Sequence, residues 1–388
     1  MITVSEALDQ LFALASPLHA EDVPLLRAAD RILADDVVAE RDQPPFPASA
    51  MDGYAVCEAQ PGAVLTVIGE SAAGHRFDGA VSPGEAVRIF TGAPVPEGAK
   101  FVVIQEDVTR SDDQITLGDR LDAAPHIRPA GNDFRAGMKV PGGTRLGAND
   151  IALLAAMNIG TVRVRRRPVV AIIATGDELV MPGETPGPDQ IIASNSFGLH
   201  ALMRQLGAAP RMLPIARDHP DSLRMVLALA QDADLVLTIG GASVGDHDLV
   251  ARVAGSLGLE QAFYKVAMRP GKPLMAGRLG GAMMIGLPGN PVSAMVCGHI
   301  FVAPVIRAML GLGQSAAPCA QAPLAADIGA NGPREHYMRA RLDNGALHVF
   351  DRQDSSLLSV LGQANALVVR PPHDPAQKAG AMQHYIAL

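Results

Sequence analysis

The feature that most constrains this fold is the alternation of apolar strands and helices between residues 168 and 314. The sequence predicts strands at 169–174, 212–216 and 235–239, with helices at 196–206 and 222–230. Such alternation is typical of a doubly wound α/β sheet, because parallel strands need a crossover connection. Ligands of such sheets bind beyond the carboxyl ends of the strands. We therefore expect a ligand site at that edge.

A glycine-rich loop follows the predicted strand at 235–239. Its sequence is Gly240-Gly241-Ala242-Ser243-Val244-Gly245, and a helical pattern begins just beyond it. Glycines let backbone N–H groups approach a ligand closely, and a helix N-terminus favours anions. The loop predicts a phosphate-bearing ligand, contacted by Gly240, Gly241, Ser243 and Gly245. A simple turn at a strand end is the alternative.

Acidic residues follow the same predicted strands. Glu178 comes after the first, Asp218 after the second and Asp248 after the glycine loop. Carboxylates beside a phosphate repel it unless a divalent cation, which prefers oxygen ligands, lies between them. We predict that these acids meet at a metal or phosphate site. Helix capping by Asp246 or Asp248 is the alternative.

Two further segments are candidate anion sites. Lys265 and Arg269 lie on a predicted strand and its exit, where strand alternation places them on one face. Solvated surface cations are the alternative. Pro288-Gly289-Asn290-Pro291 forms a rigid loop before a helix, with Pro291 suited to the first helical turn.

The rest of the chain predicts three other regions. Thr3 and Glu6 have the spacing of a capping box before an amphipathic helix, and a second helical pattern at 151–157 is expected to pack against it. Short β-type runs fill the part between them. We expect a helical region at 1–42 and 134–167, an inserted β-rich domain at 43–133, the α/β domain at 168–314, and a C-terminal β domain resembling a small barrel at 315–388.

Composition argues against several classes of protein. The net charge of -8 disfavours a nucleic-acid surface, which needs clustered Lys and Arg. The three cysteines, Cys57, Cys297 and Cys319, are too far apart to predict a disulfide framework or a zinc site. The apolar stretch 292–310 contains Ser, His and Arg, which favours a buried helix over a membrane span. The N-terminus lacks the pattern of a secretion signal, so we expect a cytoplasmic protein.

Taken as a set, the motifs resemble those of the molybdopterin molybdenumtransferase family. The terminal domain of gephyrin is similar to members of this family. The order and the residues match over nearly the whole chain, although the likeness is looser near the C-terminus. The motifs are Met51-Asp52-Gly53-Tyr54-Ala55, Arg88-Ile89-Phe90-Thr91-Gly92-Ala93-Pro94, Thr175-Gly176-Asp177-Glu178-Leu179, Gly240-Gly241-Ala242-Ser243-Val244-Gly245, Met268-Arg269-Pro270-Gly271-Lys272-Pro273 and Leu287-Pro288-Gly289-Asn290-Pro291-Val292-Ser293.

The resemblance implies an α/β multidomain fold: a doubly wound molybdopterin-binding domain, an inserted β domain, a helical dimerisation region and a C-terminal β-barrel-like domain. It also implies a homodimer whose cleft is shared between the subunits. The implied reaction converts adenylyl-molybdopterin and molybdate to molybdenum cofactor and AMP, with Mg²⁺ as cofactor. The adenylyltransferase that supplies the substrate and proteins that mature molybdenum enzymes are the implied partners, with no nucleic acid and no membrane.

Site residues carry over position by position. Those implied to be catalytic are Asp52, Thr91, Asp133, Glu178, Asp218 and Asp248. Of these, Asp218, Asp248 and Glu178 are the implied Mg²⁺ ligands. Molybdate would be bound by Lys265, Arg269, Arg339 and Ser355, with Arg269 standing where some relatives have lysine. The molybdopterin and its phosphate would contact Gly240, Gly241, Ser243, Gly245, Pro288, Gly289, Asn290 and Pro291. Lys100 has no implied role.

Two other functions remain alternatives. A molybdopterin adenylyltransferase resembles the α/β domain, but it is normally that domain alone and carries Gly-Thr-Gly where this chain has Ala242-Ser243-Val244-Gly245. A non-catalytic molybdopterin-binding scaffold, as in gephyrin, is disfavoured because this chain has no appended linker or second enzyme domain.

Overall fold

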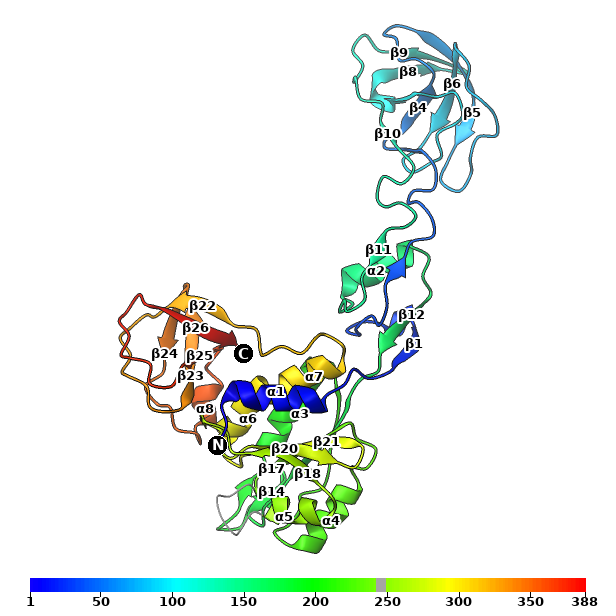
Figure 1. The fold of residues 1–388 in the computed structure, drawn as a ribbon. Coiled ribbons are helices and arrows are strands. Elements are labelled where there is room, and N and C mark those ends of the chain that lie inside the picture. Colours follow the sequence, from blue (N-terminus) through cyan, green and yellow to red (C-terminus); the bar gives the residue numbers. More distant parts are fainter. Residues whose placement is uncertain (242–248) are drawn as a thin grey trace. The chain divides into compact units, whose positions relative to one another are not determined.

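The computed structural model describes residues 1–241 and 249–388, which form two compact units (Figure 1). The first, here called the α/β unit, comprises Met1–Glu21, Asp30–Ala34 and Arg163–Leu388. The second, here called the inserted unit, comprises Asp22–Ala29 and Asp35–Val162. β1 (Ala20–Pro24) and β12 (Thr161–Arg165) form a two-stranded sheet. We describe each unit by itself.

A six-stranded sheet forms the centre of the α/β unit. Its order is β16-β13-β17-β21-β20-β18. The first four strands are parallel, β20 runs antiparallel to β21, and β18 runs antiparallel to β20. The strands are β13 (Val169–Ala174), β16 (Ala209–Met212), β17 (Leu235–Ile239), β18 (Glu260–Tyr264), β20 (Met275–Leu279) and β21 (Ala282–Leu287). The chain proceeds from β13 outward to β16 and then back to β17 on the other side. This reversal is the topological switch point at which doubly wound sheets bind ligands.

Helices cover both faces of this sheet, which confirms the predicted doubly wound fold. One face packs against α1 (Val4–Leu14), α3 (Asn195–Gln205), α6 (Pro291–Cys297) and α7 (Ala303–Met309), and the other against α4 (Pro220–Ala228) and α5 (Leu249–Ser256). Strand alternation explains the two cores. On β13, Val170 and Ile172 face the first set, whereas Ala171 and Ile173 face the second.

The apolar stretch near residue 300 is a buried helix, as predicted. A π-helical segment, Gly298–Val302, joins α6 to α7. The combined run Pro291–Met309 is long and apolar enough to cross a membrane by length and composition, but 83% of its most apolar window is buried inside the protein. A core helix meets the same criterion, so this run is weak support for a membrane span.

The N-terminal helix packs differently from our expectation. Its apolar residues Val4, Ala7, Leu8 and Leu11 belong to the main core of the α/β unit. The second helix, α2 (Ala148–Ala156), belongs to the inserted unit, where it contacts the short 3-10 helix η1 (Leu25–Arg27). The expected packing of these two helices against each other is therefore wrong. Periodicity showed that each helix has an apolar face, but it did not show which surface covers that face.

A second six-stranded sheet lies in the C-terminal part of the α/β unit. Its order is β19-β23-β25-β26-β22, with β24 paired to β23. The elements of this part are β19 (Met268–Arg269), β22 (Ala320–Pro323), β23 (Glu335–Asp343), β24 (Ala346–Val349), α8 (Leu358–Leu361), β25 (Ala366–Arg370) and β26 (Met382–Ala387). The turn between β23 and β24 has Asn344 and Gly345 at positive φ, as the Asp-Asn-Gly sequence predicts.

The inserted unit contains the predicted β-rich fold. Its main sheet has the order β7-β4-β6-β5-β9-β8. The strands of the inserted unit are β2 (Val37–Val38), β3 (Ala48–Ser49), β4 (Gly53–Val56), β5 (Val64–Ser71), β6 (Glu85–Ile89), β7 (Phe101–Ile104), β8 (Val108–Ser111), β9 (Gln114–Leu117), β10 (Ile127–Arg128) and β11 (Lys139–Val140), with a 3-10 turn, η2, at Gln105–Asp107. β2 pairs with β11 and β3 with β10, outside the main sheet. Two small cores lie on the two sides of this sheet. Tyr54 and Ile115 belong to one, and Ala55 and Ile89 to the other.

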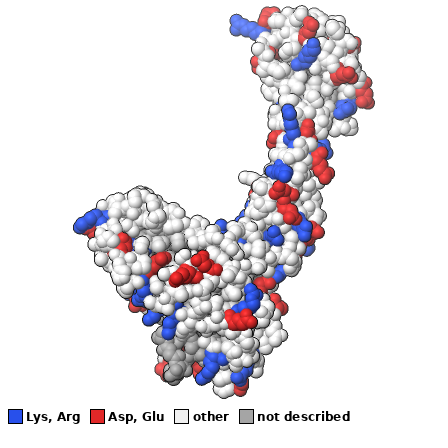
Figure 2. All heavy atoms as spheres, viewed as in Figure 1, with Lys and Arg blue, Asp and Glu red and all other residues white. Residues whose placement is uncertain are grey.

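Charged side chains are distributed without a dominant sign on the face drawn in Figure 2. Basic and acidic groups are interspersed there, and acidic groups gather over α1. The exposed side of α1 carries Glu6 and Asp9.

Candidate functional site

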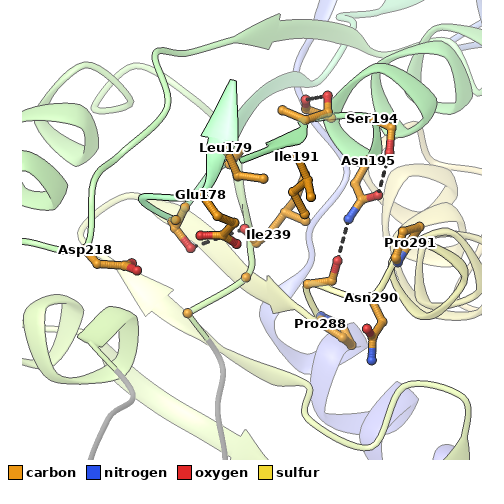
Figure 3. Close-up of a pocket in the computed structure, with 18 of the residues that line it drawn as sticks. Glu178, Leu179, Ile191, Ser194, Asn195, Asp218, Ile239, Pro288, Asn290 and Pro291 are labelled. Atoms are coloured by element: carbon orange, nitrogen blue, oxygen red, sulfur yellow. Dashed lines mark hydrogen bonds between the residues drawn. The ribbon is translucent and has the colours of Figure 1, made fainter. Parts of the chain in front are cut away.

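A pocket of about 920 Å³ lies at the switch point of the central sheet (Figure 3). The carboxyl ends of β13, β17 and β21 provide Thr175, Ile239 and Pro288, and the following loops provide most of the remaining lining. The sequence predicted a site at this edge. The structure brings together eight of the predicted residues in this pocket: Glu178, Asp218, Gly240, Gly241, Pro288, Gly289, Asn290 and Pro291.

Two glycines allow the backbone to pass close to the end of β13. Gly240 has a φ of +92°, and a Cβ atom there would lie 2.8 Å from the carbonyl oxygen of Thr175. Gly241 has a φ of +66°, and its Cβ would lie 2.4 Å from a methyl group of Val250 on α5. Residues with a side chain rarely adopt either backbone conformation, and neither position has room for a Cβ atom. Glycine is therefore required where β17 enters the predicted phosphate loop.

Two carboxylates, from turns that are far apart in the sequence, lie near each other in the pocket lining. Glu178 follows β13, and its carbonyl oxygen accepts a hydrogen bond of 2.8 Å from the amide of Ile191. Arg217 donates to the carbonyl oxygens of Asp177 and Leu179, both at 3.1 Å, on either side of Glu178. The amide of Asp218 in turn donates to the Asp177 carboxylate at 3.1 Å. These bonds fix the turn that presents Glu178 beside Asp218 (Figure 3).

The opposite part of the pocket is formed by the starts of α3 and α6. Ser194 and Asn195 stand at the beginning of α3, and the Asn195 amide donates a 2.7 Å bond to the carbonyl oxygen of Gly289 in the loop before α6 (Figure 3). This bond ties the two loops together. The short strand pair β14 (Leu179–Val180) and β15 (Ile191–Ile192) adds an apolar wall, on which Ile191 and Ile192 are 59% and 39% exposed.

Sequence reasoning missed the basic residue of this pocket. Arg252, on α5, is the one Lys or Arg among the pocket-lining residues that the structure describes. No hydrogen bond or ion pair engages its guanidinium within the described part of the chain, and its side chain is exposed. Its position in the first turn of the helix that follows the glycine loop was a usable signal, because a cation there would lie near a ligand bound by the loop. Ile191 and Asn195 were also missed.

The predicted oxyanion residues lie on a neighbouring part of the α/β unit. β19 adds to the C-terminal sheet beside β23, so that Arg269 pairs with His336. Arg339 lies further along β23. The alternation argument for Lys265 and Arg269 was wrong, because β18 ends at Tyr264 and Lys265 has a φ of +74°. The period of two is therefore interrupted. Instead, the Lys265 ammonium lies 4.9 Å above the centre of the Tyr264 ring.

Arg339 is only 1% exposed and holds the loop that carries Ser355. Its guanidinium donates to the carbonyl oxygens of Asp354 at 3.0 Å and Arg352 at 3.2 Å, while its Nε has no partner among the described residues. The carbonyl oxygen of Ser355 accepts from the amide of Val292 at the start of α6 at 3.0 Å. Ser356, the next residue, lines the pocket. Arg339 thereby connects the C-terminal sheet to the pocket rim.

The strands around Arg339 form a strongly positive environment. His336 is 7% exposed, and its pKa is lowered to about 4 by burial and then by the surrounding arginines. These are Arg269, Arg339, Arg370 and Arg334. Burial, with a smaller contribution from Arg269, also lowers the pKa of Arg339. Burial is the larger cause of this shift, and the four arginines add positive charge of the kind that suits an oxyanion.

The remaining predicted residues lie in the inserted unit. Oδ1 of Asp52 accepts hydrogen bonds from the amide of Thr91 at 2.7 Å and from its hydroxyl at 2.8 Å, and these bonds lower the pKa of Asp52. Arg88 lies over the rings of Tyr54 and Phe90 and donates to the carbonyl oxygen of Gly53 at 3.2 Å. Asp133 is exposed. The structure brings Asp52 and Thr91 into direct contact, as a pair of polar groups beside a fixed arginine.

Three predicted site residues, Ser243, Gly245 and Asp248, lie outside the described residues. Within residues 1–241 and 249–388, no group of three His, Cys, Asp or Glu side chains could hold a metal ion. Glu178 and Asp218 nevertheless supply carboxylate oxygens to the same pocket, and neither has an ion-pair partner in the described part of the chain. Such donors fit a hard divalent cation.

Comparison with known families assigns a class to each part of this architecture. Residues 2–158 match the family described as "MoeA N-terminal region (domain I and II)", residues 171–308 match "Probable molybdopterin binding domain", and residues 321–383 match "MoeA C-terminal region (domain IV)". The central sheet and its pocket thus belong to the molybdopterin-binding class of α/β domains.

Full-length relatives specify the family. The chain is 37% identical to a molybdopterin molybdenumtransferase of Nostoc sp., covering 92% of this chain and 86% of the relative. It is 36% identical to molybdopterin molybdenumtransferase 2 of Mycobacterium tuberculosis, covering 93% of each chain. A solved molybdopterin biosynthesis MoeA protein from Pyrococcus horikosii is 30% identical, with a TM-score of 0.86 over 100% of this chain and 99% of that one. The chain belongs to the molybdopterin molybdenumtransferase family.

Proposed function

We propose that this protein inserts molybdenum during molybdenum cofactor biosynthesis, converting adenylyl-molybdopterin and molybdate to molybdenum cofactor and AMP. The observation that supports this most directly is the switch-point pocket, where a glycine loop, two carboxylates and an apolar wall occur together in a member of this family. In the reaction an oxygen atom of water or of molybdate attacks phosphorus, the phosphoanhydride bond breaks and AMP leaves. The two dithiolene sulfurs then bind molybdenum in place of molybdate oxygen, which takes up protons and leaves as water.

The pocket residues divide by the part of the substrate that they suit. The backbone around Gly241 and Gly289 suits the phosphate groups, because N–H groups there can approach an anion without side-chain obstruction. Gly240 contributes the turn, since its own N–H donates to the carbonyl oxygen of Leu287 at 3.1 Å. Ile191 and Ile192 present an exposed apolar surface that suits a planar ring. Asn195 orients the Gly289 loop through its 2.7 Å bond. The substrate would therefore lie with its phosphates at the switch point.

Glu178 and Asp218, with Asp248 from the loop outside the described residues, are the proposed Mg²⁺ ligands. When bound, Mg²⁺ would neutralise charge between these carboxylates and the substrate pyrophosphate and polarise its phosphoanhydride. Arg217 keeps Glu178 in place through the carbonyl oxygens on either side of it. Without a cation, the same carboxylates would oppose an anionic ligand.

Molybdate, a tetrahedral dianion, suits the positive cluster on the C-terminal sheet. We propose Lys265, Arg269, Arg339 and the Ser355 hydroxyl as its binding groups. The four arginines around His336 support a positive potential there, and they add to burial, which is the larger cause of its lowered pKa. Arg339 contributes its charge and also fixes the Ser355 loop through two carbonyl oxygens.

We further propose a cytoplasmic homodimer in which Asp52, Thr91 and Asp133 of one subunit serve the pocket of the other. The Asp52–Thr91 pair supports a functional role, because two hydrogen bonds fix an exposed carboxylate in one orientation. The adenylyltransferase that makes the substrate and proteins that receive the cofactor are the proposed partners. Neither nucleic acid nor a membrane is among them.

Release of AMP tests the proposed reaction. Purified protein with adenylyl-molybdopterin and Mg²⁺ is expected to release AMP when molybdate is added, and to release much less without molybdate or after chelation of Mg²⁺. Consumption of ATP with molybdopterin would support the adenylyltransferase alternative instead. Binding of molybdopterin without either reaction would support a scaffold. If chelation of Mg²⁺ does not change AMP release, the proposed role of the metal is wrong, but the proposed reaction still stands.

A further inference from the structure

The segment that carries Lys265 has an unfavourable backbone conformation. Lys265 lies between β18 and β19 with a φ of +74°, in the left-handed region that residues other than glycine adopt rarely. Such conformations persist where surrounding contacts determine them, and they are concentrated at functional sites. The contacts that hold this segment are therefore candidates for a functional role.

Three different parts of the chain hold residues 265–267. The segment's own hairpin contributes two bonds, from the amide of Lys265 to Leu274 O at 2.9 Å and from the amide of Val266 to Lys272 O at 3.0 Å. The C-terminal sheet contributes one, from the amide of Glu335 to Ala267 O at 3.1 Å. The third part is the extreme N-terminus of the described chain, at Ile2.

Ile2 pairs with this segment like a short parallel strand. Its amide donates to Lys265 O at 3.2 Å, and its carbonyl oxygen accepts from the amide of Ala267 at 2.7 Å. The two bonds bracket Val266, which is completely buried. Ile2 therefore contacts the backbone on both sides of the residue that follows Lys265.

Helix α1 fixes Ile2 in this position. Thr3 and Glu6 form a capping box, in which the Glu6 carboxylate accepts from the Thr3 amide at 2.8 Å and the Thr3 hydroxyl accepts from the Glu6 amide at 3.2 Å. The helix is docked through Leu8 and Leu11 in the main core, and the Ile2 side chain packs against the same core. At its other end, Arg278 on β20 donates to Leu14 O at 2.6 Å. The N-terminal segment is thus held at both ends of the helix.

From these contacts we propose that Ile2 is a positioning residue for the oxyanion site. It holds the backbone of Lys265 to Ala267 in the observed left-handed conformation, from which the Lys265 ammonium would reach a tetrahedral dianion. Ile2 touches no reacting atom and acts only through Lys265. This inference rests on the proposed function, because that function assigns molybdate to Lys265 and Arg269.

The test replaces Ile2 and measures two ligands separately. Ile2→Asn removes the apolar anchor, whereas Ile2→Leu retains it and should restore wild-type behaviour. Leu227→Ala is the matched control, because it removes buried apolar surface on α4, on the face of the central sheet opposite α1, and leaves the docking of α1 and Ile2 unchanged. Each variant is titrated with molybdate and, separately, with AMP, and hydrogen exchange is followed at the Ala267 amide.

We expect Ile2→Asn to weaken molybdate binding by about tenfold, within the range that displacement of a binding group by about 1 Å can cause. AMP binding should be unchanged, and the Ala267 amide should exchange faster. Leu227→Ala should lower the melting temperature and leave the molybdate affinity as in wild type. Wild-type molybdate affinity in Ile2→Asn, or equal weakening in Leu227→Ala, would overturn the proposal.

Failure of the proposed function would look different. In that case the wild-type protein itself would not bind molybdate. The hydrogen-exchange measurement would still show whether Ile2 holds the segment, because the Ala267 amide reports this contact without any ligand. Unchanged exchange at Ala267 in Ile2→Asn would contradict the positioning role whatever the ligand of Lys265 is.

Discussion

The positive charge of Arg252 lies in a pocket that also contains Glu178 and Asp218. If the pocket binds the AMP-bearing part of the substrate, Arg252 should donate charge-assisted hydrogen bonds to phosphate oxygens. We predict that Arg252→Gln weakens AMP binding by about tenfold or more, since hydrogen bonds to charged groups contribute about 1.5–3 kcal/mol. Isothermal titration with AMP at two salt concentrations measures the effect.

Two further variants make this prediction specific. Arg252→Lys should retain part of the affinity, because charge persists while the forked geometry is lost. Arg224→Gln is the control, since Arg224 is an exposed arginine on α4 that pairs with Asp221 at 2.9 Å outside the pocket lining. Equal AMP affinity in Arg252→Gln and in wild type would show that Arg252 is a solvated surface residue.

His336 makes stability depend on pH in a defined direction. Burial and four arginines lower its folded pKa to about 4, below the ordinary value of 6.5. Between these values the unfolded chain binds a proton that the folded chain excludes, so the stabilisation present above pH 6.5 is lost as pH falls towards 4. The full loss is about 3 kcal/mol, at about 1.4 kcal/mol for each tenfold difference in proton affinity.

We therefore predict that His336→Gln flattens the pH dependence of unfolding in this window. Urea titrations at pH 7, 6, 5 and 4 would measure the free energy of unfolding for both proteins, with the denaturant slope checked for each. The wild type should lose more stability than the variant as pH falls. Parallel curves for the two proteins would mean that His336 is protonated in the folded state as readily as in the unfolded chain.

At the scale of the element, the sequence predicted strands best where they are buried on both faces. β13 and β17 have the predicted limits, because continuous apolar runs end at glycine or polar turns. β16 was placed too late in the sequence. It covers Ala209–Met212 rather than 212–216, and Pro210 within it weakened the signal, since proline is tolerated at the edge position that β16 has in the sheet.

The site residues also fall into those that the sequence predicted and those that it did not. The glycine loop, Glu178 and Asp218 were predictable because parallel strands place their exits at one edge. The relation between Lys265 and Arg269 was not, because a left-handed residue interrupts the strand and no local pattern marks it. Arg252 was missed because an exposed helical arginine is ordinarily just solvated. Long-range contacts, rather than residue type, distinguish these positions.

The glycine loop provides a prediction about an element. A methyl group at Gly241 meets both an unfavourable φ and Val250 at 2.4 Å, whereas one at Gly258, at a φ of +90°, meets nothing within 4 Å. Gly258→Ala should therefore cost only the backbone term, about 1–2 kcal/mol. Gly241→Ala should cost about 1–3 kcal/mol more, because the well-packed start of α5 must move.

Urea unfolding of both variants measures the difference. Gly241→Ala should also weaken AMP binding, because the displaced loop is the proposed phosphate site, while Gly258→Ala should bind AMP as wild type does. Equal stability of the two variants would indicate that the Val250 side chain moves aside at little cost. The close approach of the loop to α5 would then contribute little to the free energy of unfolding.

At the scale of the whole molecule, amphipathic patterns predicted that particular helices form but not which surfaces they pack against. The apolar stripe of α1 is compatible with another helix or with a sheet, and in the structure it enters the core beside β20 and α7. Likewise, Met268 and Arg269 become an edge strand of the C-terminal sheet although they follow directly on the central one. Such choices depend on the competition among all buried surfaces.

The last prediction concerns how the two units cooperate in a dimer. Asp52 belongs to the inserted unit and Asp218 to the α/β unit, and we propose that each cleft takes Asp52 from one subunit and Asp218 from the other. Asp52→Ala and Asp218→Ala should each be inactive alone. In a mixed dimer one cleft carries both substitutions and the other carries neither, so a randomly reassembled equal mixture should regain about a quarter of wild-type AMP release in a two-fold symmetric assembly.

The matched control combines Asp218→Ala with Glu178→Ala. Both residues line the same pocket of the α/β unit, so every cleft of that mixed dimer carries one substitution and no activity should return. Differently tagged subunits allow the mixed dimers to be isolated before AMP release is measured. If neither mixture is active, Asp52 and Asp218 of one chain contribute to the same cleft. Each cleft would then be formed by one chain and would keep that chain's substitution, so mixing the subunits could not restore activity.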